Sequence, residues 1–204
     1  MEPLSIVRAV AAPLMQPNID TDRIIRIERV AGVARDKLGP YMLEQMRFRA
    51  DGSENPDCIL NRDPWRGAKI LVAGQNFGCG SSREDAVWAI AGYGVRVVIA
   101  PSFGDIFFSN CFQNGVLPIR LGESIVEDIA AEVASAGSAE LTVDLPAQVV
   151  NTAGGGSYAF DIEPRRKQML IEGADEIGMT LKLDAKIAAF QRADRQQRPW
   201  LYPT

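Results

Sequence analysis

Alternating apolar and polar stretches predict a strand–helix–strand unit in the middle of the chain. Residues 68–74 form a compact apolar run, and a glycine-rich turn follows at 75–80. Residues 86–94 then place apolar side chains at helical spacing, and a second apolar run covers 95–101. Two strands joined through a helix run parallel, so we expect a βαβ unit here.

The same kind of pattern continues towards residue 136. Residues 102–115 predict a loop that runs into a helix, and residues 116–121 predict a further strand. Residues 123–136 alternate acidic and apolar positions at helical spacing, which predicts another helix. This succession is typical of an α/β fold.

Beyond residue 140 the period of the pattern changes to that of a strand. Segments between 141 and 162 alternate apolar and polar residues, with Pro146 and Gly154-Gly155-Gly156 between them. They predict a small antiparallel hairpin or meander. Residues 164–172 and 184–198 are predicted to be helices. We expect a single domain over residues 1–204, with a C-terminal helical extension from about residue 164.

The first sixty residues are less regular. Residues 1–22 predict a short apolar strand and a polar turn that ends in Asn18-Ile19-Asp20-Thr21-Asp22. Residues 23–62 are weakly periodic and predict a long connection with a short helix around Pro40–Met46. Connections of this length are often functional.

Composition narrows the class of protein. The chain has 204 residues, 47% of them apolar and 24% charged, which suits a globular protein of one large domain or two small ones. Its 22 basic and 26 acidic residues give a net charge of −4, which does not favour nucleic-acid binding. No run approaches 18 apolar residues, so we expect no membrane span.

The cysteine and histidine counts exclude several kinds of site. Cys58, Cys79 and Cys111 are odd in number and far apart, so they build neither a disulfide framework nor a metal knuckle. A reduced, cytoplasmic setting fits them best, and the N-terminus makes a poor signal peptide. The sequence contains no histidine, which excludes Ser-His-Asp and Cys-His catalysis and His-based zinc sites within this chain.

The most informative cluster of residues is Gly78-Cys79-Gly80-Ser81-Ser82-Arg83-Glu84. Glycines let a backbone approach a ligand closely, and a helix starting at Ser81 or Ser82 would point free N–H groups over the turn. Arg83 would add a forked cation that suits a carboxylate or phosphate. The sequence thus predicts an anion site at the carboxyl end of a parallel strand.

A purely structural interpretation competes with this one. Ser81 and Glu84 have the S-x-x-E spacing of a capping box, and from spacing alone a simple helix cap is favoured. The cluster is not a Walker A loop, because Gly-Lys-Ser/Thr is missing, nor a complete GxGxxG, because position 83 is arginine.

Three further groups carry weaker signals. Asp20 and Asp22 beside Thr21 form either an Asx turn or an acid/base or metal-binding group, and local evidence favours the turn. Four arginines are typical of a solvated face, although one or two would suit an anionic substrate: Arg23, Arg26, Arg29 and Arg35. Four phenylalanines are expected in the core: Phe103, Phe107, Phe108 and Phe112.

Several motifs together resemble one known family. They are Asp20-Thr21-Asp22, the NFGCGSSRE run at 76–84, and VVIAPSF at 97–103 followed by Asp105-Ile106-Phe107. These motifs are similar to those of the small subunit of 3-isopropylmalate dehydratase, the detached swivelling domain of the aconitase superfamily. The likeness covers roughly residues 5–190, with support from Asn114, Leu117-Pro118 and the IGMTL run at 177–181. NFGCGSSRE after a buried strand is more specific than its parts, and it favours a substrate site over a helix cap alone.

The resemblance implies an α/β, swivelling β/β/α fold and a hydro-lyase of leucine biosynthesis. The enzyme would dehydrate and rehydrate a small dicarboxylate, moving a hydroxyl between adjacent carbons of a malate derivative. The resemblance implies no metal or cofactor in this chain and a [4Fe-4S] cluster on a separate large subunit. The net charge and the lack of a long apolar run predict no nucleic-acid or membrane partner.

The resemblance also implies roles for individual residues. Ser81 would be the base that removes a proton beside a carboxylate, and Asp22 would help organise proton transfer. Arg83 would bind a substrate carboxylate. Further substrate-binding residues would be Ser82, Gly80 and Arg35.

Two departures from the family pattern keep alternatives open. The family usually continues Asp-Thr-Asp with Ile-Ile-Pro and a Phe-Leu pair, whereas Ile24-Ile25 are followed here by Arg26–Val30, and Asp85 stands where histidine is usual. That loop helps to choose the substrate side chain, so another alkylmalate such as citramalate or dimethylmalate is an alternative. A different class is a non-catalytic carboxylate-binding module, but the presence of Asp22, Ser81 and Arg83 favours the catalytic subunit.

Overall fold

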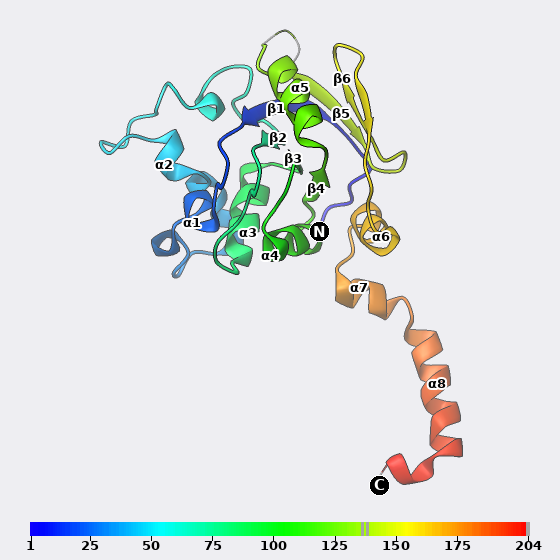
Figure 1. Cartoon of the computed structure of the whole chain (residues 1–204). Helices are drawn as coiled ribbons and strands as arrows, with labels where there is room; N and C mark the ends of the chain where they lie inside the picture. Colours follow the sequence, from blue (N-terminus) through cyan, green and yellow to red (C-terminus); the bar gives the residue numbers. More distant parts are fainter. Residues whose placement is uncertain (136, 138, 203–204) are drawn as a thin grey trace.

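The fold is organised around one seven-stranded sheet with the order β4-β3-β2-β1-β5-β6-β7 (Figure 1). The computed structural model describes residues 1–135, 137 and 139–202. Its strands are β1 (Ile6–Leu14), β2 (Ile70–Ala73), β3 (Val97–Ala100), β4 (Leu117–Arg120), β5 (Glu140–Asp144), β6 (Val149–Thr152) and β7 (Ser157–Ala159). Strands β1 to β4 are parallel, and β5 to β7 are antiparallel to their neighbours.

Strand β1 joins the two halves of the sheet. It pairs with β2 in parallel, with Ala12 opposite Leu71, and with β5 antiparallel, with Ala9 opposite Leu141. The predicted βαβ unit and the predicted meander are both confirmed. The central place of β1 was not predicted, because the pairing partners of β1 lie some 60 and 130 residues away in the sequence.

Helices cover both faces of the parallel half. The helices are α1 (Thr21–Ile24), α2 (Glu44–Arg47), α3 (Glu84–Tyr93), α4 (Asp105–Gln113), α5 (Glu123–Val133), α6 (Pro164–Glu172), α7 (Glu176–Leu181) and α8 (Asp184–Gln197). Leu71 and Val98 share a core cluster with Ile90 of α3, while Val72 and Ile99 share one with Ile129 of α5. Burial on both faces explains why β2 and β3 are continuous apolar runs.

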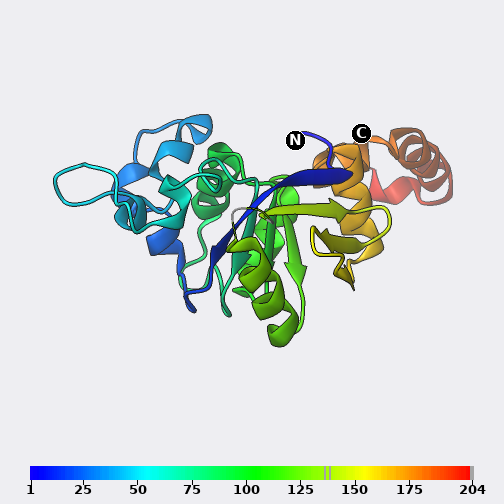
Figure 2. The same ribbon diagram turned by 90° about the horizontal axis from the view of Figure 1, so that it is seen from above.

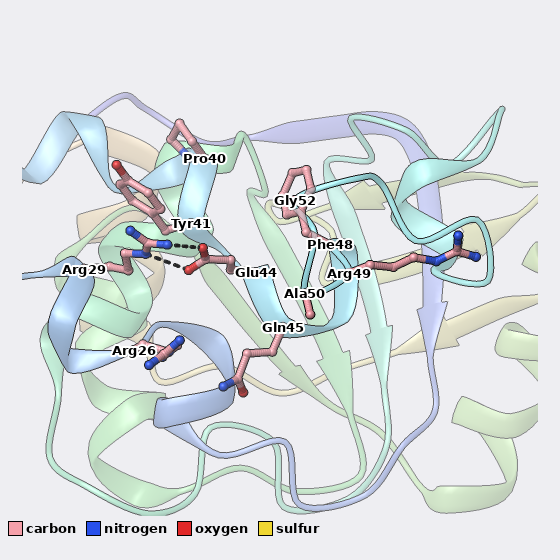
Figure 3. Close-up of a pocket in the computed structure, with 10 residues that line it drawn as sticks. All are labelled: Arg26, Arg29, Pro40, Tyr41, Glu44, Gln45, Phe48, Arg49, Ala50 and Gly52. Atoms are coloured by element: carbon pink, nitrogen blue, oxygen red, sulfur yellow. Dashed lines mark hydrogen bonds and ion pairs between the residues drawn. The ribbon is translucent and has the colours of Figure 1, made fainter.

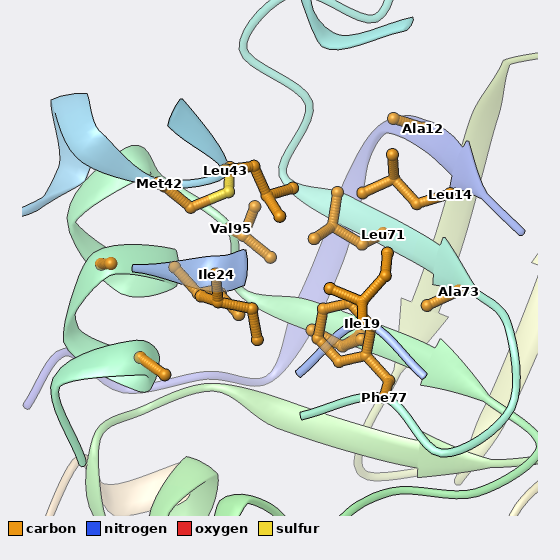
Figure 4. Packing of buried hydrophobic residues seen from close by; sticks show 14 of the residues in the cluster. Ala12, Leu14, Ile19, Ile24, Met42, Leu43, Leu71, Ala73, Phe77 and Val95 are labelled. Carbon is orange, nitrogen blue, oxygen red and sulfur yellow. The ribbon is translucent and has the colours of Figure 1, made fainter. Parts of the chain in front are cut away.

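The long connection at 23–62 closes one side of the core rather than forming a free loop. The helix predicted around Pro40–Met46 is present as a 3₁₀ turn, Gly39–Tyr41, followed by α2. Met42 and Leu43 are fully buried beside Ile24 (Figure 4). The same cluster contains Phe77, which anchors the loop after β2, so the connection and that loop share one core.

The C-terminal segment leaves the sheet. Helix α6 packs against the body, because its Met169 and Leu170 are buried and Leu4 N–H donates to the Leu170 carbonyl at 2.9 Å. Beyond it, α7 and α8 run away from the sheet, at the opposite end of the molecule from α2 (Figures 1 and 2). Within the described ranges, no helix combines the length and the apolar character needed to cross a bilayer.

Candidate functional site

The loop after β2 is held between two other segments by backbone hydrogen bonds. Gly78 N–H donates to the Ile19 carbonyl at 2.7 Å, and Thr21 N–H donates to the Cys79 carbonyl at 2.9 Å. On the other side, Gly104 N–H donates to the Phe77 carbonyl at 2.9 Å. The Asp20–Asp22 turn and the Gly78–Arg83 loop, which the sequence marked separately, therefore form one structural unit.

Two glycines allow this close approach. Gly78 has a φ of +70°, and a Cβ there would lie 2.2 Å from a ring carbon of Phe107. Gly80 has a φ of +92°, a region that side-chain-bearing residues rarely adopt. The ring of Phe107 packs edge-on to Phe77 at 5.5 Å between centroids, so the floor beneath the loop is aromatic and rigid. Phe103, Phe107 and Phe112 are buried and Phe108 partly so, which confirms their prediction as core residues.

The predicted helix start is wrong by two to three residues. Helix α3 begins at Glu84, and Arg83 occupies the N-cap position with no side-chain cap. The Ser81 carbonyl accepts hydrogen bonds from Arg83 N–H at 2.8 Å and from the Thr21 hydroxyl at 3.2 Å, so contacts with the Asp20–Asp22 turn hold the chain in a loop here. The S-x-x-E capping box is therefore not formed. Both serines are exposed, and neither hydroxyl has a hydrogen-bond partner among the described residues.

The two aspartates of the turn have different tasks. Asp20 caps α1 by accepting a hydrogen bond from Arg23 N–H at 2.7 Å. Its role is thus local and structural, but as a helix N-cap that bonds three residues on and not as the predicted Asx turn, which bonds two residues on. Asp22 instead forms an ion pair with the Arg83 guanidinium. The Arg83 side chain is 20% exposed and that of Asp22 is 54% exposed, so the cation is partly enclosed while the carboxylate faces solvent. Asp22 and Arg83 are paired in the structure although they lie 61 positions apart in the sequence. The surface of this loop therefore carries a carboxylate, a guanidinium and the free hydroxyl of Ser81.

Arg35 lies one layer away from this surface. Its guanidinium donates to Asn114 Oδ1 and stacks over the Trp88 ring, with its Cζ 5.1 Å from the ring centroid. The buried Asn114 amide in turn donates to Glu84 Oε1 at 2.8 Å. Arg35 therefore connects through Asn114 to the first residue of α3 and does not touch Ser81 or Asp22. Asn114 was not predicted to have a role in the site, although it is one of the residues that support the family resemblance.

The loop that departs from the family pattern borders an open groove of about 730 Å³ (Figure 3). Arg29 is fixed there by Glu44, with an Nε–Oε2 distance of 2.8 Å, and lies over the Tyr41 ring. Ile25 is buried and Val30 packs against the core, whereas Ile27 is 52% exposed. Of the four arginines expected on a solvated face, Arg26, Arg29 and Arg35 are exposed and Arg23 is partly buried. Arg26 and Arg29 line this groove.

The cysteines do not form a metal centre. Cys58 and Cys111 are buried and Cys79 is partly buried, and burial raises the pKa of the Cys111 thiol well above its usual value. Within residues 1–135, 137 and 139–202, no group of three or more Cys, Asp or Glu side chains is arranged to hold a metal ion. Cys58 and Cys111 are packing residues of the core.

Comparison with known proteins gives consistent matches. The family model described as "Aconitase C-terminal domain" matches residues 1–124, and LeuD_N matches 127–164. A third model, for the C-terminal domain of the 3-isopropylmalate dehydratase small subunit, matches 176–204. A 3-isopropylmalate dehydratase small subunit of Paramagnetospirillum magneticum is 48% identical over 201 residues, covering 98% of this chain and 100% of the relative. One of Rhodospirillum rubrum is also 48% identical, covering 98% and 97%.

A solved structure shares the fold. The crystal structure of a 3-isopropylmalate dehydratase from Methanocaldococcus jannaschii superposes with a TM-score of 0.65 and 23% sequence identity, covering 91% of this chain and 99% of that one. At that identity the likeness concerns the fold alone, and it agrees with the swivelling β/β/α domain expected from the sequence.

Proposed function

The chain belongs to the family of 3-isopropylmalate dehydratase small subunits, and from this premise we propose that its Gly78–Arg83 loop supplies the proton-transfer group and the carboxylate clamp of the enzyme. The protein is the small subunit of a hydro-lyase in leucine biosynthesis, which interconverts 2-isopropylmalate and 3-isopropylmalate by dehydration and rehydration. The shared name of the relatives favours this substrate over citramalate or dimethylmalate.

Ser81 is the base in this proposal. The observation that carries it is the position of Ser81 in an exposed loop, where its hydroxyl caps no helix and is free among the described residues. A serine alkoxide is costly in water, but the amino end of α3 and the Arg83 guanidinium lower that cost by stabilising negative charge. The hydroxyl is therefore available to exchange a proton with a substrate held over the loop.

Arg83 and Asp22 form the clamp. Guanidinium groups carry five N–H donors, and the contact with Asp22 leaves others for a substrate carboxylate. Asp22 holds the guanidinium in place and, being half exposed, also accepts or returns a proton at the edge of the site. The exposed Ser82 hydroxyl and backbone N–H groups near Gly80 add further donors to the substrate. Arg35, expected from the sequence to bind substrate, is instead bound to Asn114 one layer away and supports the start of α3.

The iron–sulfur cluster that the family implies does not fit this chain. Two of its three thiols are buried at separate places in the core, and the described residues contain no grouped ligand set. We place the [4Fe-4S] cluster on the large subunit, where it would supply the Lewis acid for the leaving hydroxyl. The three free cysteines also favour a reducing, cytoplasmic location.

The isolated chain is expected to be colourless and inactive. It lacks cluster ligands among its described residues and contains no histidine, so it holds only part of the site. The test measures visible absorbance and hydration of the unsaturated diacid, with the chain alone and with its large subunit. Turnover by the lone chain would refute the proposal that the site is divided between two subunits, whereas turnover that appears only on mixing supports it.

Ile27 is expected to influence which alkyl group is accepted. It is the exposed apolar residue of the Arg26–Val30 loop, because Ile25 and Val30 face the core. Removing an apolar contact of this size costs roughly 1–3 kcal/mol, so Ile27→Ala should lower kcat/KM for isopropylmalate about 10-fold or more, and for citramalate much less. Ile6→Ala, at a 59% exposed position on β1, is the matched control. An unchanged ranking of the two substrates means that the loop does not select the side chain.

A further inference from the structure

The segment from residue 176 to residue 202, here named the C-terminal arm, stands apart from the sheet domain (Figure 1). It consists of α7, α8 and a 3₁₀ turn, Pro199–Leu201. Two ion pairs hold its root to α6, between Arg165 and Glu176 and between Lys182 and Glu172. Neither α7 nor α8 has a buried apolar side chain in the described structure, so packing against the domain does not explain why the arm folds as it does.

Large apolar side chains are concentrated on this arm. Seven of the twelve exposed large apolar residues in the described part of the chain lie on it, with exposures between 36% and 74%: Ile177, Leu181, Leu183, Ile187, Phe190, Trp200 and Leu201. The spacing of Leu183, Ile187 and Phe190 places them on one face of α8, and Ile177 and Leu181 share a face of α7. Exposed apolar residues gathered on an arm in this way, here named the apolar stripe, are typical of a protein interface.

The C-terminal end of the arm is held in place by hydrogen bonds within the arm itself. The Asp194 carboxylate is buried, accepting from the Tyr202 hydroxyl at 2.7 Å and from Arg198 Nε at 2.6 Å. These contacts lower the pKa of Asp194, the Tyr202 hydrogen bond most, and they fold the 3₁₀ turn back on α8. Trp200 and Leu201 are thereby presented outward. A surface that is ordered before binding loses less conformational entropy when a partner covers it.

The large subunit is the partner that the comparisons favour for the apolar stripe. Residues 1–124 match a model described as the C-terminal domain of aconitase, a part of a longer chain, whereas the arm matches a model described for the small subunit. That second match begins at residue 176, the first residue of α7. A covalent linker provides a local concentration in the millimolar range, and a detached domain must replace it with contact surface.

We infer that the C-terminal arm is the tether by which this chain docks on its large subunit, outside the catalytic surface. This inference rests on the proposed function, which supplies the partner. The arm has five basic and three acidic side chains in a chain of net charge −4. We therefore expect the complementary groove on the large subunit to be apolar with an acidic rim. Attachment through a separate arm leaves the sheet domain free to swivel over the substrate while the two subunits stay bound.

The test separates binding from catalysis in the full-length chain. The double variant Ile187→Ser with Phe190→Ser removes the stripe on α8, and Ala185→Ser with Gln196→Ser changes the opposite face as the matched control. Each small subunit is titrated into a fixed amount of large subunit while hydration of the unsaturated diacid is measured, and the dissociation constant is measured by calorimetry. Circular dichroism verifies the helix content of each variant.

The stripe variant is expected to shift the titration midpoint and the dissociation constant about 100-fold, with an unchanged rate at saturation, because two central interface side chains typically have an effect of this order. The control should stay within about twofold of the wild type. An unchanged midpoint, or a lower saturating rate at an unchanged midpoint, overturns the inference.

A second copy of this chain is the other occupant that the experiment detects. Sedimentation of the isolated chain as a dimer that the stripe variant dissociates, with no change in the affinity for the large subunit, overturns the inference. If the wild-type mixture binds but does not turn over, the proposed function fails, and the calorimetric constants still decide the role of the arm.

Discussion

Ser81→Ala is expected to lower kcat of the reconstituted enzyme by about 100-fold or more, the usual scale for a positioned proton acceptor. The dissociation constant for isopropylmalate should change little, because Arg83 and the backbone donors stay in place. The free energy of unfolding should change by less than about 0.5 kcal/mol, since the Ser81 hydroxyl caps no helix. A true N-cap would instead lose about 1 kcal/mol.

Ser82→Ala is the comparison within the same loop. We place Ser82 among the substrate-binding donors, so its loss should raise KM more than it lowers kcat. Steady-state rates, calorimetry and thermal unfolding of both variants separate the two roles. A Ser81→Ala enzyme with nearly normal kcat and a lower melting temperature would mean that Ser81 is structural.

Arg83→Lys is expected to lower kcat/KM by about 30-fold to several thousandfold. This range corresponds to roughly 2–5 kcal/mol, the loss expected when a charge pair enclosed in a complex is broken, here the pair between Arg83 and the substrate carboxylate. An ammonium group keeps the charge but not the planar fork that contacts Asp22 and a carboxylate together. Stability should fall by less than about 1 kcal/mol, because the pair with Asp22 is partly exposed.

Arg96→Lys is the matched control for this change. The Arg96 side chain is 22% exposed and pairs with Glu2, so it resembles Arg83 in burial and partner but lies outside the site. Its kinetics should equal those of the wild type. Equal losses of kcat/KM in both variants, or a large fall in melting temperature with normal kinetics for Arg83→Lys, would contradict the clamp.

Local hydrophobic patterns predicted the strands of the sheet. Strands β2 and β3 are buried on both faces and the meander alternates with period two, so hydrophobic spacing identified them. The start of α3 was predicted wrongly because S-x-x-E is a local signal, whereas the backbone at Ser81 is held by Thr21, a residue 60 positions away. Helix α7 was not predicted from periodicity, since it has six residues and contains Gly178.

In the candidate site, too, the sequence identified the residues but not the tertiary contacts that bring them together. The sequence marked the Asp20–Asp22 turn and the Gly78–Arg83 loop, but only the parallel pairing of Asp20 with Cys79 brings Asp22 to Arg83. The separation of Asp20 as a helix cap from Asp22 as the partner of Arg83 also depends on this tertiary contact. For the arm, the helix predicted at 184–198 is present at Asp184–Gln197, but its amphipathic pattern alone does not tell a buried face from an uncovered one.

Hydrogen exchange at the substrate tests whether Ser81 removes the proton beside the carboxylate. Isopropylmalate is incubated in D₂O with the reconstituted enzyme, and deuterium incorporation at that carbon is followed by NMR, with binding measured in parallel. We expect rapid incorporation by the wild-type complex and at least about 100-fold slower incorporation by Ser81→Ala at equal substrate occupancy. Incorporation by the Ser81→Ala complex at the wild-type rate would contradict this role of Ser81.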